Sequence, residues 1–467
     1  MSLLERPEAK ALLADAELSS ATVRGCQGRL KGFLRRYLPL FFRREHRDHA
    51  EIVLAGRLSH LERKTCEPIA REAGVERKPI QLFVGNGAWD DESVMAELRR
   101  HVAEEFHDPD VTFVIDGSSF PKKGTESCGV ERQWCGRLGK VDNCQVGVFL
   151  SCVSAGRAAP LDRQLYLPKK WASNAARRQK CHVPKSLKFA PKWKLALKLI
   201  QRSRGVPHGW VTADDEFGRV SDFRATLRRR GERYVLDVPC NTLFRVLPPV
   251  APPVRGGRKK PPRVRAKKPA WVRADEWAAA QPASSWQRIE VRAGEKGPLS
   301  VDVLHANVET NVGVHERLLV IRTVEEQRRT HYCLSNAAAT AAVDEIVDAH
   351  DDRHRIEEMF ELGNGEVGFD HYEVRSWVGW HHHMTLTLLA MWFLLVERDR
   401  VGKKNTGHNG AASPRNLQPA AATPGSDRRR HRRHHHAGAA AHRRSPHLPL
   451  AHCHQNVPAP PNSDRAK

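Results

Sequence analysis

The sequence predicts an α/β protein built on a mixed β-sheet. Residues 111–115 and 210–213 are short apolar runs rich in β-branched side chains, and each ends abruptly at an aspartate. Such runs are typical of buried strands. Apolar residues at helical spacing precede the first run, and alternating strand-like runs follow the second. At 467 residues the chain exceeds one ordinary hydrophobic core, so we expect two or three domains.

Residues 1–107 are predicted to be a helical, DNA-binding region. Leu34, Leu38, Phe41 and Phe42 recur at the spacing of one helix face. Further along, residues 68–83 have the outline of a helix, a glycine-containing turn and a second helix, which is the pattern of a helix-turn-helix. The alternative is that the charged face of these helices is simply solvated.

Residues 108–239 are predicted to be the first part of a catalytic domain. The runs 143–153 and 161–167 flank a glycine-containing turn and predict a hairpin beside strand 111–115. A helix at 193–202 and the strand at 210–213 follow. This order fits a ribonuclease-H-like mixed sheet. Residues 168–192 are dense in Lys and Arg, and they are either a DNA-tracking segment or a plain exposed loop.

Residues 240–335 are predicted to be a β-rich insertion in that domain. Prolines among Arg and Lys make 248–270 an extended cationic run. Three tryptophans follow, each of which either stacks on an unpaired base or belongs to the core. The tryptophans and the expected strands are Trp271, Trp277, Trp286, 288–291, 299–304 and 318–323.

Residues 336–400 are predicted to complete the catalytic domain. Arg353 and Glu357 are four residues apart and would share one helix face, while Ile356 and Met359 would dock the neighbouring face on a core. Three adjacent histidines at 381–383 would project about 100° apart on a helix, so they do not suit one metal ion. The apolar run after them is too short to cross a bilayer and predicts a buried helix.

Charge and composition indicate a polyanion partner. The chain carries 77 Lys and Arg against 54 Asp and Glu, a formal charge of +23, and contacts with phosphates would make its binding salt-dependent. Part of the excess lies in residues 401–467, a low-complexity basic tail with too few large apolar residues to fold. Ten cysteines without a CxxC pair suggest reduced thiols in a cytoplasmic protein.

Three carboxylates are candidates for one metal centre. Asp116 and Asp214 each follow the end of an expected strand, where α/β folds place reacting groups. Glu357 lies on the expected docked helix. Two strand-end aspartates and a helix glutamate form a hard-oxygen ligand set, which Mg²⁺ prefers.

These motifs resemble the DDE transposases of bacterial insertion sequences, in the group with a Tyr-x2-Arg-x3-Glu-x6-Lys signature. Asp116 in IDGSSFPKKG and Asp214 in VTADDEFGR match the two aspartates, and the resemblance extends over residues 30–396. Arg353 and Glu357 match the Arg and Glu of the signature. The sequence departs from the signature at its Tyr and Lys positions, which hold His350 and Asn364.

The resemblance implies phosphoryl transfer on DNA by two Mg²⁺ ions, or Mn²⁺, held by Asp116, Asp214 and Glu357. Asp215 and Glu216 compete with Asp214 for the second aspartate, and Glu358 competes with Glu357. The resemblance favours Asp214 because it stands three residues before an aromatic, and Glu357 because of the Arg-x3-Glu spacing. The DNA contacts are expected at Arg353, His350, Asn364, Lys122 and Lys123.

The function expected from the resemblance is a DNA transposase that cleaves and joins insertion-sequence ends. It would act as a homodimer on transposon ends and target DNA, in the bacterial cytoplasm at the nucleoid and without a membrane partner. The departures at His350 and Asn364 keep an alternative open, a weakened or recruited transposase-derived protein that binds DNA without cutting it. A ribonuclease-H-like nuclease without strand transfer is a third possibility.

Overall fold

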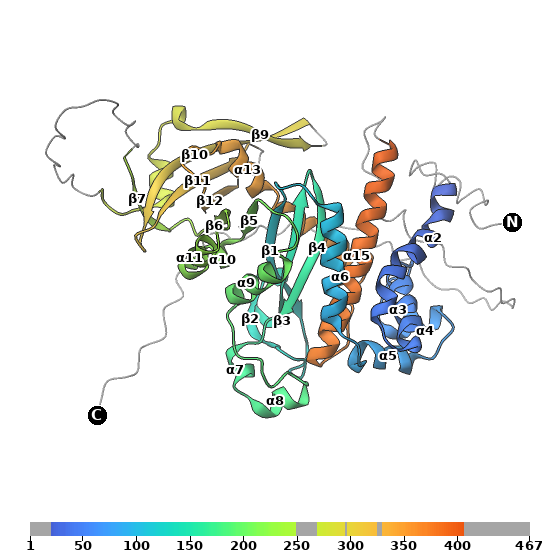
Figure 1. The fold of residues 1–467 in the computed structure, drawn as a ribbon. Helices are drawn as coiled ribbons and strands as arrows, with labels where there is room; N and C mark the ends of the chain where they lie inside the picture. The colour runs from blue at the N-terminus through green and yellow to red at the C-terminus, as the bar shows by residue number, and fades with distance from the viewer. Residues whose placement is uncertain (1–19, 249–268, 295–296, 325–328, 406–467) are drawn as a thin grey trace, which may run out of the picture.

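The computed structural model describes residues 20–248, 269–294, 297–324 and 329–405, and Figure 1 shows their arrangement. Residues 1–19, nearly all of the proline-rich run 248–270 and residues 406–467 of the expected tail lie outside the described residues. Residues 401–405, which we expected to begin the tail, are helical instead. They continue the helix that begins at Trp377, and no proline from Val401 to Asn405 interrupts it.

Within the described residues, twelve strands form one continuous hydrogen-bonded sheet. The order is β2-β3-β1-β5-β6-β12-β11-β10-β7-β8, with β4 paired to β3 and β9 paired to β10. The strands are β1 (Thr112–Pro121), β2 (Glu131–Cys135), β3 (Lys140–Ser154), β4 (Arg157–Leu165), β5 (Trp210–Ala213), β6 (Tyr234–Asp237), β7 (Leu243–Val246), β8 (Val272–Arg273), β9 (Gln287–Gly294), β10 (Gly297–Thr310), β11 (His315–Thr323) and β12 (Thr330–Ser335).

The first strands form the mixed sheet that the sequence predicts. β1 pairs antiparallel with β3, which pairs antiparallel with β4, whereas β5 and β6 run parallel to β1. Ala155 and Gly156 close the β3–β4 hairpin with positive φ angles of 48° and 74°. This arrangement of strands is consistent with a ribonuclease-H-like domain.

The strands of the expected β-rich insertion extend this sheet and do not form a separate one. β12 pairs with β6 in antiparallel register, and β11, β10, β7 and β8 follow outward. Trp277 and Trp286 pack against the small core of this region, while Trp271 is 40% exposed under the guanidinium of Arg245. Two of the three tryptophans therefore pack on the core of the insertion.

Helices precede the sheet, interrupt it and close the described chain. The last of them, α15, lies between the N-terminal helices and the sheet (Figure 1), and it packs on β4, α3, α5 and α6. No helix in the described part of the chain has the length and apolar character to cross a membrane. The helices are α2 (Ser20–Tyr37), η2 (Leu38–Leu40), α3 (Arg44–Arg57), α4 (Cys66–Glu72), α5 (Arg77–Asn86), α6 (Asp91–Glu105), η3 (Gly136–Leu138), α7 (Lys169–Ala172), α8 (Ala175–Lys180), α9 (Lys192–Ser203), α10 (Asp215–Gly218), α11 (Ser221–Arg229), α12 (Ala274–Ala279), η4 (Ala283–Ser285), α13 (Val343–Asp351), α14 (His354–Glu366) and α15 (Trp377–Asn405).

The segment 68–83 does contain two short helices, α4 and α5, around a turn at Gly74 with a φ of 67°. The apolar face of α5, which includes Ile80 and Phe83, is buried, and α5 packs on α15. Whether its opposite face binds DNA stays a prediction.

Candidate active site

Asp116 and Asp214 lie side by side at the centre of the sheet. The parallel pairing of β1 with β5 ends at Ile115 opposite Ala213. Asp214 follows the last residue of β5, as expected, whereas Asp116 lies inside β1, which continues to Pro121 because it stays paired with β3 and does not end at Ile115 as we expected. Neighbouring strands lie about 4.8 Å apart. The parallel register therefore brings together two aspartates that are far apart in the sequence.

Each aspartate is fixed by a backbone amide. Gly117 N–H donates to Asp116 Oδ1 over 2.7 Å. Asp214 caps the N-terminus of α10, where its Oδ1 accepts the N–H of Glu216 over 3.1 Å. An aspartate at this position satisfies an otherwise unpaired amide of the helix, so the local sequence sets the orientation of both carboxylates.

Glu357 comes from the first turn of α14. The opposite face of this helix is anchored by Ile356 and Met359, both buried, and by Phe360, which stacks on Phe369 with ring centroids 5.6 Å apart. α14 packs on β1, the strand of Asp116. The apolar spacing predicted from the sequence therefore positions the glutamate beside the central strands.

A buried guanidinium, Arg353, lies among these acids. Its Nη1 is 3.5 Å from Glu357 Oε1, and its Nη2 is 3.4 Å from Asp237 Oδ2. Burial lowers the pKa of Arg353, but Asp237, Glu357, Asp116 and Asp214 outweigh burial and raise it above its usual value. One buried cation is thus shared by four carboxylates.

The pKa values of the two aspartates are raised, so their charged forms are disfavoured. Burial raises the pKa of Asp116 to about 6, an effect opposed by Arg353 and reinforced by Glu357 and Glu216. Burial, and then the charge of Asp116, raise the pKa of Asp214 well above its ordinary range. Perturbed acids of this kind concentrate at functional sites. This excess of buried negative charge is suited to a bound divalent cation.

The oxygens of Asp116, Asp214 and Glu357 are not drawn together as tightly as ligands of one ion. Among the described residues, the one group of three potential metal-ligating side chains with atoms all within 4.8 Å is Asp237, His331 and His350. The predicted acids share an electrostatic environment, but they do not form such a close group.

The three competing acids have ion-pair partners of their own. The pairs are Asp215–Arg219, Glu216–Lys192 over 2.6 Å and Glu358–Arg355 over 2.7 Å. Glu216 also acts on both aspartates electrostatically. Asp214 lies close enough to Asp116 for the charge of Asp116 to raise its pKa, whereas Asp215 has a side chain that is 45% exposed and pairs with Arg219.

The residues expected to contact DNA differ in how exposed they are to solvent. His350 is buried, and its Nε2 donates to Asp237 Oδ1 over 2.8 Å. Asn364 lies two turns beyond Glu357, with a buried Oδ1 that has no hydrogen-bond partner in the described structure. Lys122 turns onto the ring of Tyr372, 3.5 Å from its centroid, and burial lowers its pKa to about 8. Lys123 is exposed.

Asp237 is a site residue that the sequence reasoning missed. It ends β6, directly after the apolar residues Tyr234 to Leu236, and it is buried. Burial favours its protonation, but His350 and Arg353 hold the pKa of Asp237 well below its usual value. The rule that found Asp116 and Asp214, a carboxylate ending a β-branched apolar run, applies to Asp237 as well.

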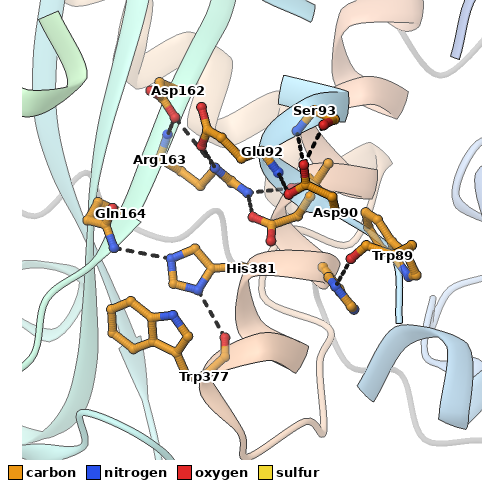
Figure 2. A network of polar contacts seen from close by, with 12 residues as sticks. Trp89, Asp90, Glu92, Ser93, Asp162, Arg163, Gln164, Trp377 and His381 are labelled. Carbon is orange, nitrogen blue, oxygen red and sulfur yellow. Dashed lines mark hydrogen bonds and ion pairs between the residues drawn. The ribbon is translucent and has the colours of Figure 1, made fainter. Parts of the chain in front are cut away.

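The histidines at 381–383 are buried and point in different directions. Figure 2 shows the first of them between Gln164 and Trp377, whose carbonyl it hydrogen-bonds over 2.9 Å. The second donates to the carbonyl of Trp89, and the third accepts a hydrogen bond from Arg57. These three histidines form part of the packing and do not share one ligand.

Comparison with known proteins assigns the chain to a family. Residues 36–298, more than half of the chain, match the family described as DDE superfamily endonuclease. The matched segment includes Asp116 and Asp214 and ends before Glu357. The chain is also 26% identical over 197 residues to the probable transposase for insertion sequence element IS701 of Microchaete diplosiphon. That alignment covers 41% of this chain and 49% of the relative, so the chain spans about half the length of the curated relative it matches.

Proposed function

The chain belongs to the DDE superfamily of endonucleases, and on that premise we propose that it is an insertion-sequence transposase of the Tyr-Arg-Glu-Lys signature group. It would cleave the ends of its element and join them to target DNA. The observation that supports this most strongly is the shared electrostatic environment of Asp116, Asp214 and Glu357 around Arg353.

The residues present fit a divalent cation. Glu357 and Glu216 add to the raised pKa of Asp116, Asp116 and Glu216 add to that of Asp214, and the opposing charge of Arg353 does not offset them. Asp116, Asp214 and Glu357 would hold Mg²⁺, with Mn²⁺ as the substitute. When bound, the metal lowers the pKa of the attacking water or hydroxyl and stabilises the leaving 3′-oxygen.

Arg353 would orient a phosphate next to the cut. Its Nη atoms face Glu357 and Asp237, while its Nε has no hydrogen-bond partner among the described residues. A guanidinium offers a rigid, planar set of donors that matches phosphate oxygens. Asp237 would fix the orientation of that fork from the side away from Glu357.

DNA is the proposed partner, as both transposon ends and target. The formal charge of +23 favours a polyanion. Near the sheet, α7 and α8 carry Lys169, Lys170, Arg177 and Lys180, and the Arg177 guanidinium lies 3.7 Å from the ring centroid of Trp171. Lys123 is exposed beyond the end of β1. We propose that the protein works as a homodimer on DNA in the bacterial cytoplasm, at the nucleoid.

A supercoiled donor plasmid carrying the element ends tests the proposal, with nicked, linear and joined products scored in Mg²⁺. Asp116→Asn, Asp214→Asn and Glu357→Gln should each abolish cleavage and leave end binding intact, because they remove ligand oxygens and keep the side-chain size. Asp215→Asn and Glu358→Gln are matched controls at adjacent positions and should cleave normally. Cleavage near the wild-type rate by any of these three ligand variants would contradict the assignment.

A second candidate function is a transposase-derived protein that binds DNA and does not cut it. The observations that favour it are the burial of His350 against Asp237 and the unpartnered amide oxygen of Asn364. The double variant His350→Tyr, Asn364→Lys separates the two functions in the same plasmid assay. A large gain of cleavage identifies a damaged enzyme, and binding without cleavage by both proteins identifies the second function. Nicking without joined products indicates a nuclease that lacks strand transfer.

A further inference from the structure

Four potential metal ligands gather at Asp237, the carboxylate that pairs with Arg353. Cys333 of β12 stands directly opposite Asp237 of β6 in the antiparallel register. His331 is two residues from Cys333 on the same strand, so both side chains face one side of the sheet. His350, in the last turn of α13, covers that side. Three elements therefore converge on Asp237.

The ligand atoms of the cluster are already close together. His350 Nε2 lies 2.8 Å and Cys333 Sγ 3.1 Å from Asp237 Oδ1, and His331 Nδ1 lies 3.4 Å from Oδ2. The two imidazole rings meet edge to face, with centroids 5.3 Å apart. A tetrahedral site with bonds of 2.0–2.3 Å needs ligand separations of roughly 3.3–3.8 Å. The ligand atoms of Asp237, His331 and His350 all lie within 4.8 Å of one another, and Cys333 Sγ reaches this group through its contact with Asp237, so a tetrahedral site requires these side chains to move inward.

We propose that Asp237, His331, Cys333 and His350 bind a divalent transition-metal ion of the zinc type. Two imidazole nitrogens, a thiolate and a carboxylate are a ligand set that Zn²⁺ accepts in tetrahedral geometry. Mg²⁺ prefers oxygen ligands only, so this site differs in chemistry from the acids around Asp116. The thiolate and the carboxylate together balance the charge of the ion.

Binding requires one proton to leave the cluster. Burial, and then the charge of Asp237, hold the pKa of Cys333 well above its usual value, so the thiol is protonated without metal. When the ion binds, the S–H proton passes to solvent and the sulfur becomes a thiolate ligand, while each neutral imidazole that now donates to Asp237 carries its proton on the other ring nitrogen and leaves the first free to bind the metal. The hydrogen bonds that now link Asp237 to its neighbours are replaced by bonds to the metal.

The ion would fasten the helix that carries the active-site residues. His331 and His350 are 94 and 113 residues from Asp237 in the sequence. Arg353 follows three residues after His350, and Glu357 lies one turn beyond it. A bound ion would tie the end of the β-rich insertion and the start of α14 to β6. This role goes beyond the proposed function, because it requires no DNA and no cleavage.

Co²⁺ tests the proposal, since its spectrum reports both geometry and sulfur ligation. The full chain, stripped with a chelator and reduced, is titrated with Co²⁺ alone. We expect one equivalent with intense visible bands of a tetrahedral site and a thiolate-to-metal band in the near ultraviolet. Cys333→Ser should lose the thiolate band. His350→Gln keeps a donor to Asp237 but should weaken Co²⁺ binding at least about 100-fold, the upper end of what a lost outer partner costs.

Two controls separate this site from other metal-binding groups in the chain. His305→Ala removes a histidine of β10 outside the cluster and should leave the spectrum unchanged. Asp116→Asn should also leave it unchanged, even where that variant has lost cleavage, so the outcome is independent of the proposed function. Histidines elsewhere, such as residues 434–436, bind Co²⁺ without a thiolate band.

The proposal is overturned if the wild-type protein gives no thiolate band, or if Cys333→Ser and His350→Gln give the wild-type spectrum. Circular dichroism checks that each variant is folded. If a variant is unfolded, the test uses two measurements on the wild-type protein. Zn²⁺ must then raise its melting temperature and must displace Co²⁺ with loss of the thiolate band, and failure of either rejects the site.

Discussion

Arg353→Lys tests whether the fork of the guanidinium, and not its charge alone, matters to the active site. A lysine keeps the positive charge but has one compact ammonium, which cannot face Glu357 and Asp237 at once. The present contacts, 3.5 and 3.4 Å, are long for charge-assisted bonds. We therefore expect the lower end of the usual loss, about 1.5 kcal/mol in the free energy of unfolding. The effect on cleavage should be larger, about 100-fold to 1,000-fold, as for other preorganised donors to a reacting group.

The matched control for this prediction is Arg355→Lys. Arg355 lies on the same helix and pairs with Glu358 over 2.7 Å, but it does not approach Glu357 in an ion pair. Its replacement should change stability and cleavage little, because a partly exposed pair within one helix contributes less than about 1 kcal/mol. The assays are single-turnover nicking of the plasmid, end binding and chemical unfolding. Wild-type cleavage by Arg353→Lys, or an equal loss in both variants, would refute the reasoning.

Stability should fall in mild acid, because burial lowers the pKa of His381 to about 3 and of His382 to about 4. Below about pH 6.5 these two histidines take up protons in the unfolded chain but not in the folded protein. Each histidine therefore lowers the free energy of unfolding by up to about 1.4 kcal/mol for each pH unit, from about pH 6.5 down to about pH 4. Urea unfolding at pH 7 and pH 5 measures this, and an unchanged midpoint would contradict it. Asp162→Ala should destabilise the protein by about 3–5 kcal/mol, since it removes a fully buried acid that pairs with the buried Arg99 and Arg163 and accepts from Arg202 Nε over 2.8 Å. Asp222→Ala, at an exposed helix terminus, is its control and should cost under about 1 kcal/mol. Gly218→Ala should prevent correct folding, because its Cβ would collide with a backbone carbonyl at the end of β6; circular dichroism and gel filtration check this, and a compact, fully folded variant would contradict it.

The central sheet was predictable because its signals are local. Short β-branched runs and a glycine-containing turn located β1, β3, β4 and β5, although β1 continues through Asp116 to Pro121 and does not end at Ile115. Helical spacing around Met359 placed α14 and its glutamate in the same way. Each of these signals lies within one element, so the sequence alone could locate it.

Pairings between distant elements were not predictable in this way. Nothing near Cys333 indicates that it stands opposite Asp237, because the register of β12 on β6 depends on side chains from both strands. For the same reason, the sequence predicts the strands of the β-rich insertion but not that they extend the central sheet. The burial of His350 depends on how α13 docks, which its own sequence does not determine.

The position of α15 has a consequence for biosynthesis. This helix is the last in the described chain, and it packs on both the earliest helices and β4 (Figure 1). During synthesis, the N-terminal helices and β4 therefore emerge from the ribosome long before α15, the helix that packs on both of them. Such late, long-range contacts slow folding. A nascent or truncated polypeptide would thus expose the apolar surface that α15 covers.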